Sequence, residues 1–248
     1  MNIGQIRGAF PGRRIDYYPT IDSTMNAAAP LEPGAVVFAG EQTAGQGRHG
    51  HSWHSEAGTG LYCSIVLQPS PVLTLALGLA AAEAIASTYG IACDLRWPND
   101  LMLDGKKVAG ILVHLEKPVT DGTFSDFRTP SAKAIAGIGI NVNHTAFPAA
   151  LEATSLRAHL GRPLSLEPLA IALLHSIDAF VLEDKETILR LFAHASSYAA
   201  GRRVTVDLPE GRIEGTTAGL NPDGFLVVRK DDGTATLILA GGVRAAGS

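Results

Sequence analysis

The stretch Gly45-Gln46-Gly47-Arg48-His49-Gly50-His51-Ser52-Trp53 decides which folds this chain can adopt. Its three glycines leave backbone N–H groups uncovered, and its arginine offers a fork of donors that suits a carboxylate or a phosphate. The run lacks the Gly-Lys-Ser/Thr of a P-loop, and the following segment, Leu61–Leu67, is typical of a strand rather than the helix of a dinucleotide fingerprint. Both a loop around an anionic ligand and an ordinary chain turn therefore stay open.

The bulk properties indicate a soluble globular protein. The chain has 248 residues, of which 46% are hydrophobic and 18% charged, so it can bury a core in one or two domains. The net charge of −4 does not favour binding to DNA or to an anionic membrane. Val72–Ala86, the longest apolar run, contains Glu83 and is too short to span a bilayer easily. Two cysteines in apolar segments, Cys63 and Cys93, and a start without a signal sequence favour the reducing cytoplasm.

The hydrophobic pattern predicts a mixture of helices and strands. Helices are expected at Met25–Ala29, where Ser23 is a candidate N-cap, and at Val72–Tyr89, which Gly90 would end. Two further helices are expected at 166–182 and 185–199. Strands are expected at Ala35–Ala39, Leu61–Leu67, Cys93–Trp97, Leu101–Leu103, Lys107–Leu115 and Ala134–Val142.

Turn signals complete this organisation. Asp104-Gly105 is a strong hairpin signal, and the polar segment Lys117–Pro130 is expected to be a hairpin loop. After Gly201, four short strand-like runs are separated by turns that contain glycine. Their spacing predicts a small all-β barrel of about 48 residues.

A second segment that could carry chemistry surrounds Lys107. A lysine that begins a strand directly after a tight turn could reach a phosphate, or it could be a solvated hairpin lysine. Asn99 and Asp100 follow a proline, and they could bind Mg²⁺ or a nucleotide or simply shape the turn.

The three loop histidines, His49, His51 and His54, invite a zinc hypothesis. They lie on a Gly/Ser loop without a supporting cysteine, so polar loop residues are the favoured interpretation and no metal site is predicted.

Taken together, the motifs resemble those of bacterial biotin protein ligases, the enzymes also called biotin–[acetyl-CoA-carboxylase] ligases. The order and spacing match from about residue 15 to the C-terminus, and each motif is weak alone. The motifs that carry the resemblance are Asp22-Ser23-Thr24, the run Gln42–Arg48, Trp53, Arg96-Trp97-Pro98-Asn99-Asp100, Lys107–Leu112 and Gly137-Ile138-Gly139-Ile140-Asn141-Val142-Asn143.

The resemblance implies an α+β fold in two parts. A mixed-sheet catalytic domain with helices packed on it would span residues 1–200, and an SH3-like C-terminal domain would span 201–248. The DNA-binding domain of the bifunctional repressor members is missing before residue 15, which resembles the short, ligase-only class. The implied partners are biotin, ATP with Mg²⁺ and the biotin carboxyl carrier protein, without DNA or a membrane, and a homodimer is left open.

The resemblance also implies the reaction and its residues. Biotin would be activated as biotinyl-5′-AMP and then transferred to a lysine of the carrier. The catalytic cations would be Lys107 and Arg48. The biotin site would comprise Ser23, Thr24, Gln42, Gly45, Gln46, Gly47, Arg48, Lys107 and Gly110, and the ATP site Arg48, Trp53, Asn99, Asp100, Lys107 and Asn141.

Three features qualify this assignment. The family often carries arginine where this chain has Gln46, so Arg48 is the loop's only permanent cation. Trp53 could pack on the ligand or anchor the loop. The rival functions are a lipoate ligase or octanoyltransferase, which share the core fold, and a non-catalytic biotin sensor.

Overall fold

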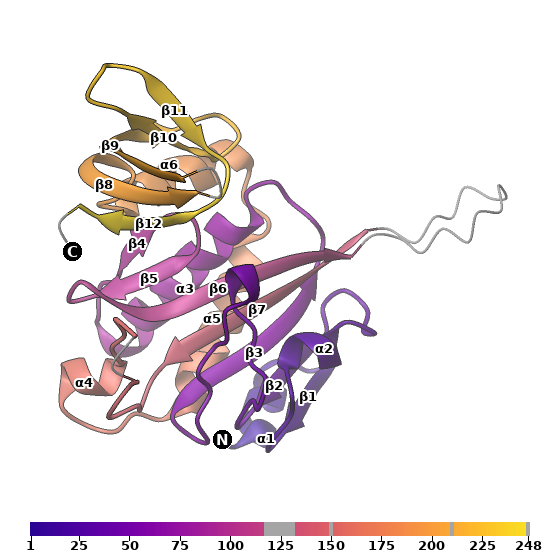
Figure 1. Ribbon diagram of the computed structural model, residues 1–248. Coiled ribbons are helices and arrows are strands. Elements are labelled where there is room, and N and C mark those ends of the chain that lie inside the picture. Colours follow the sequence, from indigo (N-terminus) through magenta and orange to yellow (C-terminus); the bar gives the residue numbers. More distant parts are fainter. Residues whose placement is uncertain (117–131, 149–150, 209–210, 247–248) are drawn as a thin grey trace, which may run out of the picture. The chain divides into compact units, whose positions relative to one another are not determined.

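The computed structural model describes residues 1–116, 132–148, 151–208 and 211–246 (Figure 1). The chain separates into two compact units. Unit 1 comprises Met1–Ser70 and Val108–Ile171, and unit 2 comprises Pro71–Lys107 and Ala172–Ser248. The hairpin loop expected at Lys117–Pro130 lies outside the described residues.

Unit 1 is built on a mixed sheet in the order β1-β2-β3-β7-β6. β1 runs parallel to β2, whereas the other neighbours are antiparallel. All eight residues of β3 are buried, which explains why its sequence is a continuous apolar run rather than an alternating one. The strands are β1 (Ile15–Tyr18), β2 (Val36–Ala39), β3 (Gly60–Leu67), β6 (Lys106–Glu116), which begins in unit 2, and β7 (Lys133–Asn141).

The helices of unit 1 begin at polar caps. Ser23 lies before α2 (Thr24–Ala28), and its hydroxyl accepts a hydrogen bond from the Met25 N–H, as the N-cap signal predicted. Asn2 and Ser155 cap two helices that were not predicted, α1 (Ile3–Ala9) and α4 (Leu156–Leu160). Helix α5 (Leu166–Phe180) continues into unit 2.

Helix α2 packs against β2, β3 and β7. The buried cluster beneath it includes Met25 and Ala28 of the helix and Val37, Val66 and Ile135 of the three strands. Removal of this apolar surface from water stabilises the helix, which at five residues is too short to be stable alone.

Unit 2 begins with α3 (Leu73–Tyr89) and the hairpin of β4 (Asp94–Arg96) and β5 (Asp100–Leu103). Gly90 ends α3 in the left-handed conformation, as predicted. Asp104 and Gly105 have φ values of 52° and 74°, which is the geometry that a two-residue hairpin turn requires.

The last helix, α6 (Lys185–Ala195), packs on α3. It ends before the predicted Ala199, because Ser196 has extended backbone and its hydroxyl donates to the Leu95 carbonyl.

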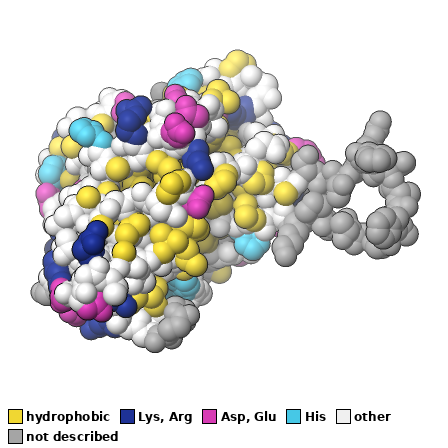
Figure 2. Space-filling model, turned by 90° about the horizontal axis from the view of Figure 1, so that it is seen from above, with side chains coloured by type: hydrophobic (Ala, Val, Ile, Leu, Met, Phe, Trp, Pro, Cys, Tyr) yellow, Lys and Arg dark blue, Asp and Glu magenta, His cyan; other side chains and the backbone are white. Residues whose placement is uncertain are grey.

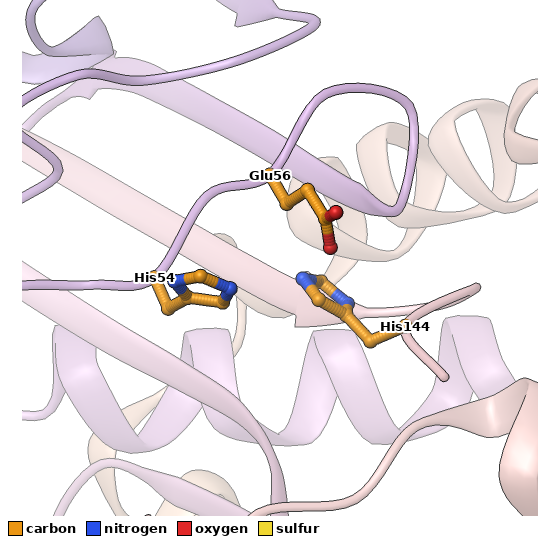
Figure 3. Close-up of side chains that lie close together, drawn as sticks. All are labelled: His54, Glu56 and His144. Atoms are coloured by element: carbon orange, nitrogen blue, oxygen red, sulfur yellow. The ribbon is translucent and has the colours of Figure 1, made fainter. Parts of the chain in front are cut away.

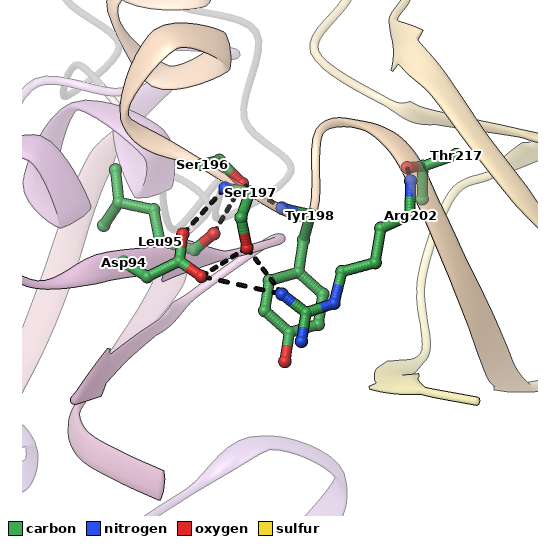
Figure 4. A network of polar contacts seen from close by, with 7 residues as sticks. All are labelled: Asp94, Leu95, Ser196, Ser197, Tyr198, Arg202 and Thr217. Atoms are coloured by element: carbon green, nitrogen blue, oxygen red, sulfur yellow. Dashed lines mark hydrogen bonds and ion pairs between the residues drawn. The ribbon is translucent and has the colours of Figure 1, made fainter. Parts of the chain in front are cut away.

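A polar network then joins β4 to the start of the C-terminal sheet (Figure 4). Ser197 donates its N–H to the Asp94 carboxylate at 2.7 Å and its hydroxyl to the other carboxylate oxygen. The Arg202 guanidinium donates to the Ser197 hydroxyl and lies 4.0 Å from the centre of the Tyr198 ring. These contacts hold the chain in place where it leaves α6.

The C-terminal sheet has five antiparallel strands in the order β11-β10-β9-β8-β12. The strands are β8 (Ala200–Leu208), β9 (Gly211–Leu220), β10 (Leu226–Arg229), β11 (Ala235–Ile238) and β12 (Gly242–Ala245). The last strand was not predicted. The sequence predicted a barrel, but within the described residues the sheet is open, because β11 and β12 do not pair with each other. Its two edge strands have only four residues each, and each pairs with a single neighbour.

Two observations concern membrane-spanning helices and the distribution of surface charge. Among the described helices, none combines the length and apolarity that would be needed to cross a bilayer. On the face drawn in Figure 2, acidic and basic side chains are interspersed with hydrophobic ones.

The buried indole of Trp97 generates a stability prediction. Its N–H donates to the Gly224 carbonyl at 2.9 Å, and the residue is 4% exposed. Trp97→Phe leaves this buried carbonyl without its donor, so the free energy of unfolding should fall by about 1–3 kcal/mol. Urea unfolding followed by circular dichroism measures the change. Leu182→Ala, at a side chain 85% exposed, is the control and should change it by less than about 0.5 kcal/mol. Equal midpoints for Trp97→Phe and the wild type would contradict the role of this hydrogen bond.

Candidate functional site

A buried polar network lies between α2, β3 and the segment that follows β2. The side-chain oxygen of Gln42 accepts hydrogen bonds from the Thr24 N–H at 2.9 Å and the Thr24 hydroxyl at 3.0 Å. The side-chain amide of Gln42 donates to the Ser55 hydroxyl at 2.9 Å. Because Thr24 gives its proton to Gln42, the Ser64 hydroxyl donates to Thr24, at 2.8 Å. The network therefore joins two residues predicted for the biotin site, Thr24 and Gln42, to Ser55 and Ser64, which were not predicted. Ser23, also predicted, precedes Thr24 in the chain and caps α2 instead.

Ser64 is the residue that sequence reasoning missed most clearly. It is fully buried on β3, and it is the only hydroxyl-bearing serine or threonine in the run Leu61–Leu67. A buried hydroxyl costs free energy unless it is hydrogen-bonded, so its presence in an apolar strand was an available signal.

The glycine-rich segment forms a closed loop. Trp53 donates its N–H to the Gly45 carbonyl at 2.8 Å, and Gly47 donates to the His51 carbonyl at 2.7 Å. The Gly47 N–H, one of the groups that the glycines left uncovered, is therefore used inside the loop. The Gln46 amide donates to the Asn26 side chain at 2.9 Å, which fastens the loop to α2. Arg48 begins a single turn of 3-10 helix, Arg48–Gly50.

The sheet under this loop has a strip without side chains. A Cβ at Gly139 would lie 2.4 Å from the Trp53 indole, and a Cβ at Gly137 would lie 2.9 Å from the Met25 sulfur. Gly110 lies opposite Gly139 in the β6–β7 register. Gly137 and Gly139 thus allow close packing of Met25 and Trp53 on β7, and Trp53 anchors the loop to the sheet.

In unit 2, two cations share one carboxylate. The Lys107 ammonium lies 2.6 Å from one oxygen of Asp100, and the Arg96 guanidinium lies 2.7 Å from the other. The exposed fractions of the Lys107, Asp100 and Arg96 side chains are 29%, 15% and 17%. The three groups carry a net charge of +1 in a partly desolvated position, which favours an anion. Lys107 is thus not a fully solvated hairpin lysine.

The other predicted nucleotide residues differ in their surroundings. Asn99 is half-buried in the turn between β4 and β5. Asn141 is 4% exposed, and its amide donates to the Thr154 carbonyl at 3.1 Å, so part of its hydrogen-bonding capacity holds the segment before α4.

Burial controls several titratable groups. It raises the pKa of the Cys63 and Cys93 thiols to about 12, which keeps both protonated at neutral pH and argues against a cysteine nucleophile. It also raises the pKa of Tyr62 to about 12. Burial, together with neighbouring His54, lowers the pKa of His144 to about 4.

Comparison with protein families and relatives gives a consistent result. The model of the "Biotin/lipoate A/B protein ligase family" matches residues 12–123, and the "Biotin protein ligase C terminal domain" matches residues 200–243. The "Bifunctional ligase/repressor BirA" of Bacillus subtilis (strain 168) is 30% identical over 243 residues, covering 90% of this chain and 71% of the relative. The "Biotin--[acetyl-CoA-carboxylase] ligase" of Mycobacterium tuberculosis is 29% identical over 222 residues, covering 84% of this chain and 77% of the relative.

Solved structures agree with these relatives. The structure described as "Biotin protein ligase from Aquifex aeolicus in complex with biotin and ATP" aligns with a TM-score of 0.79 at 28% identity. The alignment covers 94% of this chain and 99% of that chain.

The contact between Gly139 and Trp53 generates a second prediction. Gly139→Ala places a methyl group where the indole lies, so Trp53 must move away from the sheet toward water. In a Trp97→Phe background, the remaining tryptophan emission should shift to the red. Gly8→Ala is the control, because a Cβ at Gly8 meets nothing within 4 Å. Identical spectra for both variants would show that Trp53 does not rest on Gly139.

Proposed function

We infer the function of this chain from the family to which it belongs, the biotin protein ligases. It activates biotin with ATP as biotinyl-5′-AMP and transfers the biotinyl group to a lysine of the biotin carboxyl carrier protein of acetyl-CoA carboxylase. The observation that carries this inference at the level of the residues is the surplus positive charge of Arg96, Asp100 and Lys107.

The first step joins two anions. A carboxylate oxygen of biotin forms a bond to the α-phosphorus of ATP, and the bond from that phosphorus to the bridging oxygen breaks, which releases pyrophosphate. In the second step the carrier's lysine amine attacks the acyl carbon, AMP leaves, and the amine loses a proton as the amide forms. Positive groups are needed in the first step because nucleophile and phosphate repel each other.

We assign that positive charge to Lys107 and Arg48. Lys107 already lies beside a carboxylate, and an incoming phosphate or carboxylate can take the place of one Asp100 contact at little electrostatic cost. Arg48 lies in the glycine-rich loop and would hold the phosphate of the adenylate.

The polar network of unit 1 suits the biotin head, which carries a ureido group on an apolar bicycle. Ser23 and Thr24 offer buried hydroxyls, and Gln42 a half-buried amide, beside the apolar side chains of α2 and β3. The assigned backbone contacts are those of Gly45, Gln46, Gly47, Arg48 and Gly110.

On the nucleotide side we assign Trp53, Asn99, Asp100 and Asn141. Both carboxylate oxygens of Asp100 are engaged by cations, so this side chain does not fit a protein-held Mg²⁺ ion. We therefore place the Mg²⁺ that accompanies ATP on the phosphates of the nucleotide and assign it no protein ligand.

Further assignments follow from the same proposal. We place the catalytic domain at residues 1–200 and the SH3-like domain at 201–248. A cytoplasmic location and a homodimer remain predictions, and the size of the native protein by light scattering tests the latter.

Transfer of labelled biotin to an apo carrier domain, in the presence of ATP and Mg²⁺, tests the function. We expect label on the carrier with biotin and none with lipoate in parallel. Transfer of lipoate instead would identify a lipoate ligase, and biotin binding without transfer would identify a sensor.

Replacement of the lysine beside Asp100 tests its role. Lys107→Ala should slow adenylate formation by roughly 100-fold or more, because the charge next to the reacting phosphate is lost. Pyrophosphate release measures this step. Lys106→Ala removes the exposed lysine directly before it and should leave the rate close to that of the wild type. Near-wild-type release by Lys107→Ala would exclude the assigned role.

Replacement of the loop arginine tests retention of the intermediate. Arg48→Ala should shorten the lifetime of enzyme-bound biotinyl-AMP by roughly tenfold or more, because a charge-assisted contact to its phosphate is lost. Filter binding of labelled intermediate measures the lifetime. His49→Asn is the matched control, since His49 has a φ of 55° and asparagine tolerates that conformation. If both variants retain the intermediate equally long, the loop does not hold it through Arg48.

A further inference from the structure

Lys133 is a charged residue at the start of an apolar strand, and the proposed reaction does not use it. It is the first residue of β7 and is half-buried. Its ammonium group donates hydrogen bonds to the Ala29 carbonyl and, at 3.1 Å, to the Leu31 carbonyl, both about a hundred residues earlier in the chain. Lysine usually keeps its charged end in water, so this inward-directed ammonium group indicates a specific role.

The two carbonyls lie where α2 ends, and the N–H groups that would continue the helix do not serve them. Ala29 is the C-cap of α2, so its carbonyl needs a partner from outside the helix. Four residues later stands Pro33, which has no N–H, and the N–H groups of Gly34 and Ala35 donate elsewhere. The Lys133 ammonium takes the place of the missing donors, and its positive charge is favourable at the C-terminal end of a helix.

The other end of α2 carries residues assigned to biotin. Thr24 begins the helix, and its N–H and hydroxyl donate to the Gln42 side chain at 2.9 Å and 3.0 Å. A helix of five residues is about 7.5 Å long and moves as one body. A shift of its C-terminal end therefore changes the distance between Thr24 and Gln42, and an N–H···O hydrogen bond weakens beyond about 3.2 Å.

One face of β7 supports α2 along its length. Lys133, Ile135 and Gly137 lie on the same face because side chains alternate along a strand. Ile135 belongs to the buried cluster beneath α2, and Met25 of the helix lies directly over Gly137. These apolar contacts are non-directional, so they hold the helix down without fixing its position along the strand. The directional hydrogen bonds of Lys133 fix that position.

The far end of β7 is anchored as well, so the strand is a fixed base for α2. His144 follows β7, is buried, and has its Nε2 atom 2.8 Å from the Thr59 hydroxyl and 3.2 Å from the Tyr62 hydroxyl. Both hydroxyls donate to the Glu56 carbonyl, so Nε2 carries the ring hydrogen and donates to them. His54 and Glu56 lie beside the same ring (Figure 3), but this nitrogen has no lone pair left, so the cluster does not suit a cation.

We propose that Lys133 is a positioning residue for biotin binding. By holding the C-terminal end of α2, it keeps Ser23 and Thr24 at the distance from Gln42 that recognition of the ureido group requires. Lys133 acts through α2 and not on the substrate, and the inference rests on the biotin site assigned under the proposed function. Biotin and biotinyl-5′-AMP share the ureido head, so Lys133 should strengthen the binding of both equally and leave the chemical step unchanged.

Replacement of the ammonium group tests this role. Lys133→Met keeps an apolar stem but cannot donate, so biotin alone should bind roughly fivefold or more weakly in calorimetry. The KM for biotin should rise by a similar factor, whereas kcat and the KM for ATP should stay within about twofold of the wild type. Lys133→Arg can donate to both carbonyls and should restore most of the affinity. Lys185→Met, at an exposed lysine of α6, is the control and should match the wild type.

A double variant separates positioning from general stabilisation. Since Lys133 is proposed to act through the start of α2, adding Lys133→Met to Thr24→Ala should weaken biotin binding by less than about twofold further. If Lys133→Met fails to fold, Lys133→Gln replaces it in both measurements, because its amide is shorter and neutral but can still donate, and it should show a smaller loss in the same direction.

Three results would overturn the role of Lys133 alone. They are unchanged biotin affinity of the folded variant, a fall in kcat as large as the rise in KM, and fully additive losses in the double variant. A wild-type protein that binds no biotin would instead refute the proposed function, and this inference with it.

Discussion

The side-chain amide of Gln42 can take only one orientation, and several segments of unit 1 depend on it. Its oxygen accepts from the N–H and the hydroxyl of Thr24, and its nitrogen donates to the Ser55 hydroxyl. The Thr24 N–H can only donate, so a reversed amide would lose that hydrogen bond and place two donors against each other. Each buried polar group left unpaired costs about 1–3 kcal/mol. The amide thereby specifies where α2 begins, and it also sets the position of the segment that leaves the glycine-rich loop.

This arrangement explains how an apolar sheet can present polar groups without unfolding. The hydroxyls of Thr24 and Ser64 are paired with each other before any ligand arrives. A polar ligand group exchanges one set of hydrogen bonds for another, so binding does not start from a costly unpaired state. The charged cluster of unit 2 follows the same logic, because Asp100 holds Lys107 and Arg96 until a stronger anion competes.

The elements with strong local signals were predictable. Helix α3 was anticipated up to its terminal Gly90, and the Asp104-Gly105 turn has the expected left-handed geometry. In contrast, α1, β1 and β12 are short, and contacts remote in sequence decide them. The Asn2 N–H, for example, bonds to Glu167, and β12 pairs with β8. The end of α6 was overestimated because the Ser196 hydroxyl bonds to Leu95, about a hundred residues earlier in the chain.

The residues of the candidate site also divide into those that sequence motifs indicate and those that only the fold brings together. Lys107, Arg48 and the glycines could be proposed as site residues because their motifs lie in order along the chain. Ser64 and His144 were not, because their importance comes from neighbours that only the fold brings near. A single serine in an apolar strand is a weak signal, and a histidine far from the loop carries none until the sheet places it there.

The two-residue turn at Asp104-Gly105 makes the length of the chain part of the chemistry. Successive side chains on a strand point to opposite faces. One residue added to or removed from this turn would shift the register between β5 and β6. Lys107 would then point away from Asp100, even with the sequences of both strands unchanged. In this family member, the length of the turn therefore decides whether Lys107 meets Asp100, as much as the identity of the two side chains does.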